Sequence, residues 1–401
     1  MDNILQSAGH TIDRGTLRLN DAGKYDYIIL NTCTVKKPTE QKIISKLERL
    51  SNLNKNIVVT GCLASATPNI VKKASPTAKI LKTSETIKIL NTLVPEGQEV
   101  PIAEKPSFIN SNGIIARIPI SEGCLSSCSF CETKYARGPL KSFDENVILK
   151  AISRSINNGS YEIELTSQDI GAYGADKKTN IAELALHAAA LDGDFMLRIG
   201  MLNPEHLHKY LDSLIEALKQ DKVFKFLHLP IQSGSNKILK DMQRNYTTYD
   251  IQYYFDYIRN KIPDITISTD IIVGYPTESI KDFKLTEELL FGIKPTITNI
   301  SKFWQRPHAK ASKLQQINAN EIKRRSTKLS REIREMQVLQ YNNFKGLREE
   351  VVVTENNNGL VSGRDIYYRP VAVLSKELTV GDKVTVEIVD SSYACMISKP
   401  I

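Results

Sequence analysis

The sequence predicts an α/β protein with three parts: a small N-terminal parallel α/β domain, a central incomplete (β/α)6 barrel and a small C-terminal β-barrel. Apolar strand-like runs alternate with segments of helical periodicity from Tyr25 to Leu81 and again from Gly113 to Ser301, a pattern typical of parallel sheets. After Leu347, short alternating strands replace this pattern. A chain of 401 residues has room for three domains, and we expect them at residues 1–103, 110–340 and 344–401.

Within the first part, strands are expected at Tyr25–Asn31, Asn56–Gly61 and Ile80–Leu81, with a helix over residues 39–50. Residues 95–112 contain prolines, glycines and weakly patterned polar sequence, which predicts a linker.

The central part contains six strand candidates separated by helical segments such as Asn146–Ile156 and Ile280–Phe291. The strand candidates are Ile114–Ile120, Tyr161–Leu165, Phe195–Ile199, Phe226–Leu229, Ile265–Val273 and Thr296–Ser301. Polar residues gather where these strands end, at Glu122, Ser167–Asp169, Arg198, Gln232–Ser233 and Asp270. Because the active sites of parallel barrels form at the carboxyl ends of their strands, we expect a site there.

The tail is predicted to be all-β, with strands at Glu350–Thr354, Val361–Gly363, Val371–Leu374 and Lys383–Ile388. Such a chain favours a small oligonucleotide-binding type of barrel. A packing domain without a binding role is the alternative.

Composition and charge limit the class of protein. A hydrophobic content of 41% and a charged content of 24% are ordinary for a globular protein. No segment approaches the ~20 apolar residues of a membrane span, and Met1–Ile4 does not begin a signal peptide. Six cysteines, half of them within eight residues, argue against a disulfide framework. We therefore expect a cytoplasmic protein without a membrane partner.

The net charge of +8 is concentrated in one segment. Residues 302–348 contain twelve Lys and Arg against three Glu, a net charge of +9. A solvated helix face explains such a run on charge alone, whereas a phosphate-binding surface is the interpretation favoured by the rest of the chain.

The most informative motif is the run Cys124, Cys128 and Cys131, spaced Cys-x3-Cys-x2-Cys. Three thiolates this close can hold three corners of a [4Fe-4S] cube and leave one iron open to a small molecule. A zinc site completed by a distant histidine and a set of three buried thiols are the alternatives.

The same triplet resembles the signature of the radical S-adenosylmethionine (SAM) enzymes. The resemblance implies that the open iron binds the amino and carboxylate groups of SAM, and that one electron cleaves a C–S bond to release a 5′-deoxyadenosyl radical. Phe130 matches the aromatic residue that packs near the adenine in that superfamily.

Further runs resemble the radical SAM methylthiotransferases in the order that the family has them. They are Asn31–Lys36, Thr60–Ala64, Glu164–Gly174, Arg198–Pro204, His228–Ser235 and Thr269–Pro276. The tail is similar to the RNA-binding TRAM module of that family. The runs from Cys131 to Ser142 and from Thr166 to Gly174 look most like the archaeal and eukaryotic members, which convert N6-threonylcarbamoyladenosine (t6A) at position 37 of tRNA to its 2-methylthio form.

The resemblance implies roles for individual residues. Cys124, Cys128 and Cys131 would hold the SAM cluster, and Cys33 and Cys62 would hold an auxiliary [4Fe-4S] cluster that carries the methylthio group. The candidates for the SAM pocket are Phe130, Ser167, Gln168, Gln232, Val273 and Gly274; those for the substrate or SAM pocket are Arg198 and Asn203. Lys134 and Arg137 would hold RNA phosphate or the threonyl carboxylate, or serve only as surface residues.

One part of the family pattern is missing. The family has a first strand and a third auxiliary-cluster cysteine near its N-terminus, but Met1–His10 aligns with the helix that follows them. We expect either a start codon farther upstream or a short chain with an incompletely ligated second cluster. Cys395 is expected to be a structural thiol of the tail.

The sequence therefore predicts a radical SAM transferase that acts on the tRNA anticodon loop with SAM and [4Fe-4S] clusters. A reductase or a flavodoxin- or ferredoxin-type protein would supply electrons, and the sulfur donor is not indicated. The alternatives are the same chemistry on isopentenyladenosine in tRNA or on a protein residue, and a noncatalytic RNA-binding protein with a structural metal.

Overall fold

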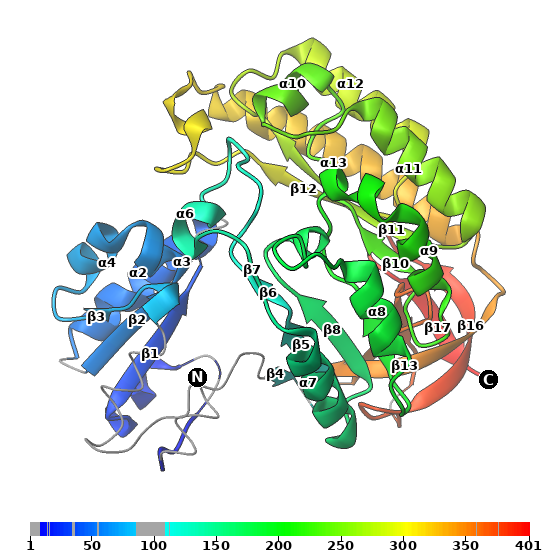
Figure 1. Cartoon of the computed structure of the whole chain (residues 1–401), viewed down its shortest axis with the longest axis horizontal. Coiled ribbons are helices and arrows are strands. Elements are labelled where there is room, and N and C mark those ends of the chain that lie inside the picture. The colour runs from blue at the N-terminus through cyan, green and yellow to red at the C-terminus, as the bar shows by residue number, and fades with distance from the viewer. Residues whose placement is uncertain are drawn as a thin grey trace. The chain divides into compact units, whose positions relative to one another are not determined.

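The computed structural model describes residues 9–13, 15, 17–33, 37–53, 56–85, 109–111, 113–357, 359–375 and 377–401. The chain divides into two compact units, which are described separately (Figure 1). The first comprises Met1–Glu104, Cys131–Pro139 and Trp304–Ala309, and the second comprises Lys105–Phe130, Leu140–Phe303 and Lys310–Ile401. Among the described helices, none has the length and apolar character needed to cross a bilayer.

The first unit contains a parallel sheet whose described strands have the order β1-β2-β3. These strands are β1 (Tyr27–Thr32), β2 (Asn56–Gly61) and β3 (Lys79–Ile80), so the three predicted strands are confirmed. The accompanying helices are α2 (Lys37–Ser51), α3 (Cys62–Ala66), α4 (Pro68–Ala74) and α6 (Thr133–Arg137), with short 3-10 turns at Leu19–Lys24 and Thr83–Glu85. Leu47, Val59, Leu63 and Val71 form the centre of the core.

The second unit contains the predicted parallel strands, each within two residues of its expected ends. They are β5 (Ile115–Pro119), β8 (Glu162–Thr166), β9 (Met196–Arg198), β10 (Phe226–His228), β11 (Thr266–Val273) and β12 (Ile297–Lys302). The described sheets have the orders β4-β5-β8-β9 and β10-β11-β12, and parallel bridges from Leu197 to Val223 and from Met201 to His228 connect their neighbouring edges. The expectation of an incomplete parallel barrel is confirmed.

One element of this unit was not expected. β4 (Ile109–Ser111) lies inside the predicted linker and pairs antiparallel with β5. Two short strands, β6 (Ser121–Glu122) and β7 (Lys141–Ser142), form a separate hairpin-like pair that brackets the cysteine loop in sequence.

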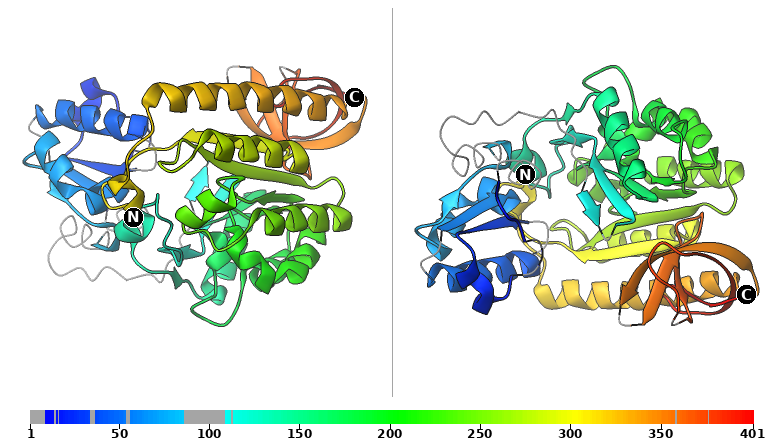
Figure 2. Two further views of the ribbon diagram at one scale, coloured as in Figure 1. Left: turned by 90° about the horizontal axis from the view of Figure 1, so that it is seen from above. Right: turned by 90° about the horizontal axis from the view of Figure 1, so that it is seen from below.

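The helices of the second unit lie along the outside of the strands (Figure 2). They are α7 (Glu145–Asn157), α8 (Ile181–Ala189), α9 (Leu211–Lys219), α10 (Asn236–Asp241), α11 (Thr248–Lys261), α12 (Ile280–Ile293) and α13 (Ala319–Asn342), with 3-10 turns at Ile170–Ala172, Pro204–Lys209 and Lys310–Lys313. Alternate strand residues such as Ile163, Leu165 and Leu197 belong to the apolar core beneath these helices. Because strand side chains alternate between faces, Glu162, Glu164 and Arg198 point to the opposite, inner face.

The tail forms a closed barrel of the strands β13 (Arg348–Asn357), β14 (Leu360–Arg364), β15 (Pro370–Val373), β16 (Lys383–Ser391) and β17 (Met396–Pro400). The sequence predicted the first four and missed β17, which pairs parallel with β15 and antiparallel with β16 and thereby closes the barrel. Cys395 is half-buried in the turn before β17, where its carbonyl accepts a hydrogen bond from the Ser392 amide.

The tail barrel packs on the amino ends of the parallel strands. The ring of Tyr368 lies 4.9 Å from that of Phe224 and 5.0 Å from that of Phe226, and the Lys225 amide donates to the Ile366 carbonyl. A second contact buries Val352 against Ile114 and Ile115. The tail barrel and the parallel strands therefore form one folded body.

Candidate metal and cofactor site

The three-cysteine loop begins directly after β6, at the carboxyl-end rim of the parallel strands. Cys124 and Cys128 are half-buried and belong to the second unit, and Cys131 is exposed and begins the segment assigned to the first unit. Backbone hydrogen bonds fix the loop at Ser129, whose amide donates to the Met242 carbonyl and whose carbonyl accepts from the Ala311 amide. Phe130 packs against a small apolar cluster of Ile238, Met242, Tyr275, Phe303 and Ala311.

Arg244 fixes the sulfur of Cys128. One of its terminal nitrogens donates to Cys128 Sγ at 3.3 Å, the other donates to the Pro230 carbonyl at 3.1 Å, and Nε donates to the Tyr246 hydroxyl at 2.8 Å. The side chain is buried, and a guanidinium remains charged in any protein environment. A fixed cation next to a cysteine sulfur stabilises the thiolate, which is the form that binds metals.

Sequence reasoning missed Arg244. It lies in the polar run Gln243–Asn245 beyond α10, where an arginine is ordinarily an exposed residue. Nothing in that run indicated a contact with a cysteine 116 residues earlier.

The donor set of the loop is three thiols within eight residues. In a [4Fe-4S] cube each of three thiolates binds a different iron, and thiolates are also ligands of zinc. Among the described residues, no three His, Cys, Asp or Glu side chains are grouped closely enough to share one ion.

Two predicted cofactor residues follow β8. The Ser167 hydroxyl accepts a hydrogen bond from the Asp169 amide at 3.0 Å and so shapes the turn. Gln168 Oε1 is buried and has no hydrogen-bond partner among the described residues. Because an unsatisfied buried acceptor costs free energy, this oxygen is suited to receive a hydrogen bond from a ligand.

Gln232 follows β10 in a strained conformation. Its φ of 67° lies in the left-handed region that non-glycine residues rarely adopt. The strain is held because its amide donates to the Asp270 carbonyl and its carbonyl accepts from the Ile272 amide. Backbone strain that the surroundings maintain is common at ligand sites.

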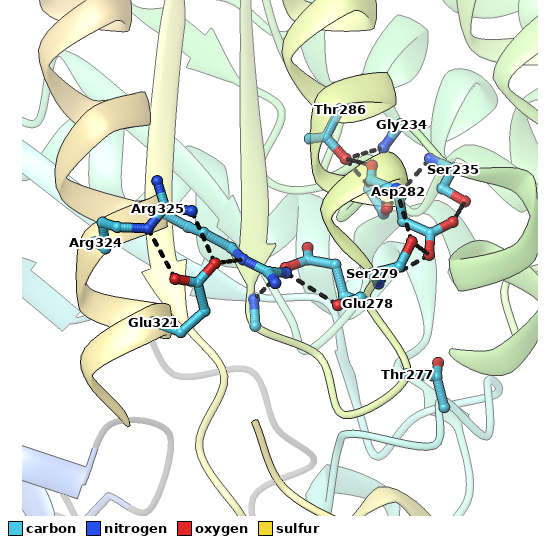
Figure 3. Close-up of polar contacts among 12 residues, drawn as sticks. Gly234, Ser235, Thr277, Glu278, Ser279, Asp282, Thr286, Glu321, Arg324 and Arg325 are labelled. Carbon is cyan, nitrogen blue, oxygen red and sulfur yellow. Dashed lines mark hydrogen bonds and ion pairs between the residues drawn. The ribbon is translucent and has the colours of Figure 1, made fainter. Parts of the chain in front are cut away.

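Val273 and Gly274 end β11 at a turn that is fixed to α13. Gly274 has a φ of 83°, and a Cβ there would lie 2.6 Å from Ile322. Its amide donates to Glu278, which forms an ion pair with Arg325 at 2.8 Å (Figure 3). Burial raises the pKa of Glu278, although Arg325 opposes the shift.

A second polar cluster fixes the Gln232–Ser235 loop to α12 (Figure 3). The Gly234 amide donates to Thr286 Oγ1, and the Ser235 hydroxyl donates to Asp282 at 2.7 Å. Burial opposes the ionisation of Asp282, but hydrogen bonds from Ser279 and Ser235 lower its pKa to about 2. The two loops that follow β10 and β11 are therefore held in place before any ligand binds.

Two further predicted site residues of this unit, Asn203 and Arg198, lie apart from each other, one at the cysteine loop and one on the inner face of the strands. Asn203 donates to the Ser126 hydroxyl at 3.1 Å and so contacts the cysteine loop. Arg198 lies on the inner face, 3.5 Å from Glu164, with its guanidinium over the rings of Phe226 and Tyr368. Sequence reasoning did not anticipate the partner from the tail barrel.

In the first unit, Cys33 and Cys62 follow residues that pair directly in the sheet, Thr32 and Gly61. Gly61 has a φ of 96°, and a Cβ there would lie 2.3 Å from the Thr32 carbonyl oxygen, so only glycine permits this approach of the two strand ends. Arg137 Nε donates to Cys62 Sγ at 3.3 Å, and Lys134 is exposed. Residues 34–36 of the first motif lie outside the described residues.

The parallel strands and the cysteine loop at their carboxyl ends define a radical SAM protein, and the family model described as the Radical SAM superfamily matches residues 118–290. The model described as Uncharacterized protein family UPF0004 matches residues 2–82. A probable threonylcarbamoyladenosine tRNA methylthiotransferase of Archaeoglobus fulgidus is 37% identical over 396 residues, covering 96% of this chain and 92% of that protein. The threonylcarbamoyladenosine tRNA methylthiotransferase of Homo sapiens is 32% identical, covering 98% of this chain and 71% of that protein.

This chain belongs to the threonylcarbamoyladenosine tRNA methylthiotransferase family, which confirms the resemblance to archaeal and eukaryotic members. Among solved structures, the radical S-adenosylmethionine methyltransferase TsrM from Kitasatospora setae superposes with a TM-score of 0.55, covering 73% of this chain and 68% of that one. At 12% identity, this similarity shows a common fold alone.

Proposed function

We propose that this protein adds a methylthio group to C2 of N6-threonylcarbamoyladenosine at position 37 of tRNA. The observation that carries the proposal is the three-cysteine loop at the strand rim, with Cys128 held by a buried arginine, in a chain of this family. Adenine C2–H is neither acidic nor easily displaced, so ionic chemistry does not replace that hydrogen. When bound, [4Fe-4S] clusters and SAM supply the one-electron chemistry and the methyl group that the substitution requires.

In this proposal, Cys124, Cys128 and Cys131 hold the SAM cluster. The hydrogen bond from Arg244 holds the Cys128 sulfur in position. Because the cation is fixed by two further hydrogen bonds, little reorganisation is needed when the cluster binds.

The SAM pocket is assigned to the loops that the two polar clusters hold. Gln168 Oε1 accepts a hydrogen bond from SAM, since no described protein group donates one to it. Gln232, Val273 and Gly274 offer polar backbone at the rim, and Ser167 supports the turn before Asp169. Phe130 packs near the adenine, and Asn203 lies next to the cysteine loop. Arg198, which the sequence placed in the substrate or SAM pocket, packs instead against Tyr368 of the tail barrel, which speaks against that role.

Cys33 and Cys62 are proposed as ligands of the auxiliary cluster. Their place after paired strand residues and the hydrogen bond from Arg137 to Cys62 support this role. That contact favours a function for Arg137 at the cluster over contact with RNA phosphate. For Lys134, contact with RNA phosphate or the threonyl carboxylate and a surface role stay open. A third thiolate is not assigned.

The division into residues 1–103, 110–340 and 344–401 gives the tail the role of RNA-binding module. An anticodon loop can present its bases without opening a duplex, which suits a site at an open rim. The electron donor is proposed to be a reductase or a flavodoxin- or ferredoxin-type protein, with a separate sulfur donor.

The test uses anaerobically reconstituted protein, SAM, a chemical reductant and tRNA that carries t6A. We expect 2-methylthio-t6A and 5′-deoxyadenosine, with no methylthio product from matched tRNA lacking the threonylcarbamoyl group. Product on isopentenyladenosine tRNA or on a protein instead would establish a different substrate. Bound zinc without the broad absorption near ~400 nm of iron-thiolate clusters would favour a noncatalytic RNA-binding protein.

A further inference from the structure

A basic groove runs between α13 and the edge strand β12 in the second unit. Its volume is about 470 Å3, and three cations line it: Lys302 from β12, and Arg331 and Arg334 from α13. Arg331 and Arg334 are three residues apart and therefore lie on the same face of the helix.

Three of the other four basic residues of α13 are neutralised by carboxylates, and the fourth, Lys323, is exposed. Arg324 pairs with Glu321 at 2.8 Å, Arg325 with Glu278 at 2.8 Å and Lys328 with Glu287 at 2.6 Å. Within the part of the chain that the structure describes, Lys302, Arg331 and Arg334 have no such ion pair. Besides Lys323 near its start, this helix therefore has unpaired positive charge along the groove.

The groove also offers hydrogen-bond donors. Thr327 and Ser330 line it with hydroxyl groups, whereas the Ser326 hydroxyl already donates to the Lys323 carbonyl, and Glu335 is the one acidic residue of the lining. Cations interleaved with hydroxyls are the side chains that contact nucleic-acid phosphates and sugars.

One end of the groove lies next to the proposed SAM pocket, and the other lies next to the tail barrel. Lys302 pairs with Val273 in the sheet, next to the proposed SAM pocket. At the other end, the Arg334 guanidinium lies 4.6 Å from the ring centroid of Tyr393, an exposed aromatic residue in the β16–β17 turn of the tail barrel. A hydrogen bond from the Ser391 hydroxyl to Asn342 joins this part of the barrel to the end of α13.

We propose that this groove binds the phosphate backbone of tRNA along the path from the tail barrel to the rim, with Tyr393 as a stacking surface for a base. The inference rests on the proposed function and adds the surface that positions the RNA. From Thr327 to Arg334 the helix rises about 10 Å, enough for contacts with more than one phosphate.

The test compares two double variants of the holoenzyme, each of which removes two positive charges from α13. Arg331→Gln with Arg334→Gln removes two of the three positive charges that line the groove. Arg324→Gln with Lys328→Gln is the matched control, because both of these residues form ion pairs with carboxylates. The binding of t6A-containing tRNA is measured by fluorescence anisotropy over a range of salt concentrations. We expect the groove variant to bind on the order of tenfold more weakly at moderate salt and its salt slope to fall by about 1.4–1.8.

The control should lose less than about threefold, because its side chains are already neutralised by neighbouring carboxylates. Arg331→Lys with Arg334→Lys should restore most of the affinity, since phosphate contacts depend mainly on charge. SAM cleavage without tRNA should not change, and circular dichroism should show that each variant is folded.

Equal losses in the groove variant and the control would overturn the proposal, as would unchanged affinity in the groove variant. Slower reduction by an acidic electron-transfer protein with unchanged tRNA affinity would assign the groove to that protein instead. Wild-type protein that binds tRNA but forms no methylthio product would contradict the proposed function and leave the groove standing. Wild-type protein that does not bind tRNA would contradict both.

Discussion

The two ends of the parallel strands in the second unit differ in how their polar groups are satisfied. At the carboxyl ends, Gln168 Oε1 has no described partner and Gln232 holds a strained backbone. At the amino ends, the Tyr368 hydroxyl of the tail barrel donates to Glu162 at 2.6 Å and lies 3.1 Å from Glu164. The carboxyl end, here called the rim, offers the Gln168 oxygen to a ligand, whereas the amino end, here called the junction, joins the parallel strands to the tail barrel.

At the junction with the tail barrel, burial shifts the pKa values of two ionisable side chains. Burial raises the pKa of Glu162 to about 7, and burial also raises the pKa of Tyr368 well above its ordinary value. These groups are thus best accommodated in their neutral forms. Substitutions at the rim should change chemistry with little effect on stability, and substitutions at the junction should do the reverse.

The largest effect is expected at the rim for Cys128→Ala. The change removes one of three proposed cluster ligands together with the partner of Arg244, so the formation of 5′-deoxyadenosine in reduced, reconstituted protein should fall to background. Cys395→Ala, in the tail barrel, is the matched control and should retain parent activity. Parent-level cleavage by the Cys128 variant would show that the loop does not hold the SAM cluster.

Arg244→Lys should come next. Lysine keeps the positive charge but cannot reach Cys128, Pro230 and Tyr246 together, because its one nitrogen replaces a three-nitrogen fork. Loss of a charged hydrogen bond worth about 1.5–3 kcal/mol predicts SAM cleavage slower by roughly 10- to 100-fold. As a positioning residue, Arg244 should also affect the electron paramagnetic resonance spectrum of the reduced cluster. An unaltered spectrum and rate would contradict this role.

At the junction, Glu162→Gln should change how stability depends on pH. A folded-state pKa of about 7, raised above the unfolded value of about 4.3, means that the folded state binds the proton more tightly. The associated stability is full at low pH and is lost as pH rises from about 4.3 to 7. Because glutamine remains neutral, the variant should match the parent near pH 4 and exceed it above pH 7 by about 3–4 kcal/mol. Urea unfolding at several pH values measures the difference, and parallel pH profiles would disprove it.

The smallest effect is expected for Tyr368→Phe. The ring keeps its contacts with Phe224 and Phe226, but the hydroxyl between Glu162 and Glu164 is lost, at a cost of about 1 kcal/mol. Amide exchange in residues 365–369 should become roughly fivefold faster, while SAM cleavage should stay within twofold of the parent. Slower SAM cleavage with unchanged exchange would reverse the proposed division between the two ends.

The six parallel strands could be predicted because each contains apolar residues at strand-like spacing and is separated from the next by a helical segment. β4 could not, because residues 109–111 are mostly polar and become a strand only by pairing with β5. β17 was missed because its five residues end in Lys399 and Pro400, although tertiary pairing with β15 and β16 stabilises it.

For the candidate site too, local features could be predicted from the sequence and long-range contacts could not. The cysteine loop is visible in the sequence because its three sulfurs are neighbours along the chain. Arg244 is 116 residues from the cysteine that it contacts, and Tyr368 is 206 residues from Glu162. No local pattern encodes such contacts, since they exist only after the barrel and the tail have folded together.

Tyr368 also bears on how this protein can be rebuilt from parts. A chimera that exchanges only the last sixty or so residues for those of a relative would separate the Tyr368 hydroxyl, in the tail, from Glu162 and Glu164, in the parallel strands. A working chimera must therefore take Tyr368, Glu162 and Glu164 from the same parent protein. Core and tail are expected to have diversified together at this point, even where their outer surfaces drifted apart.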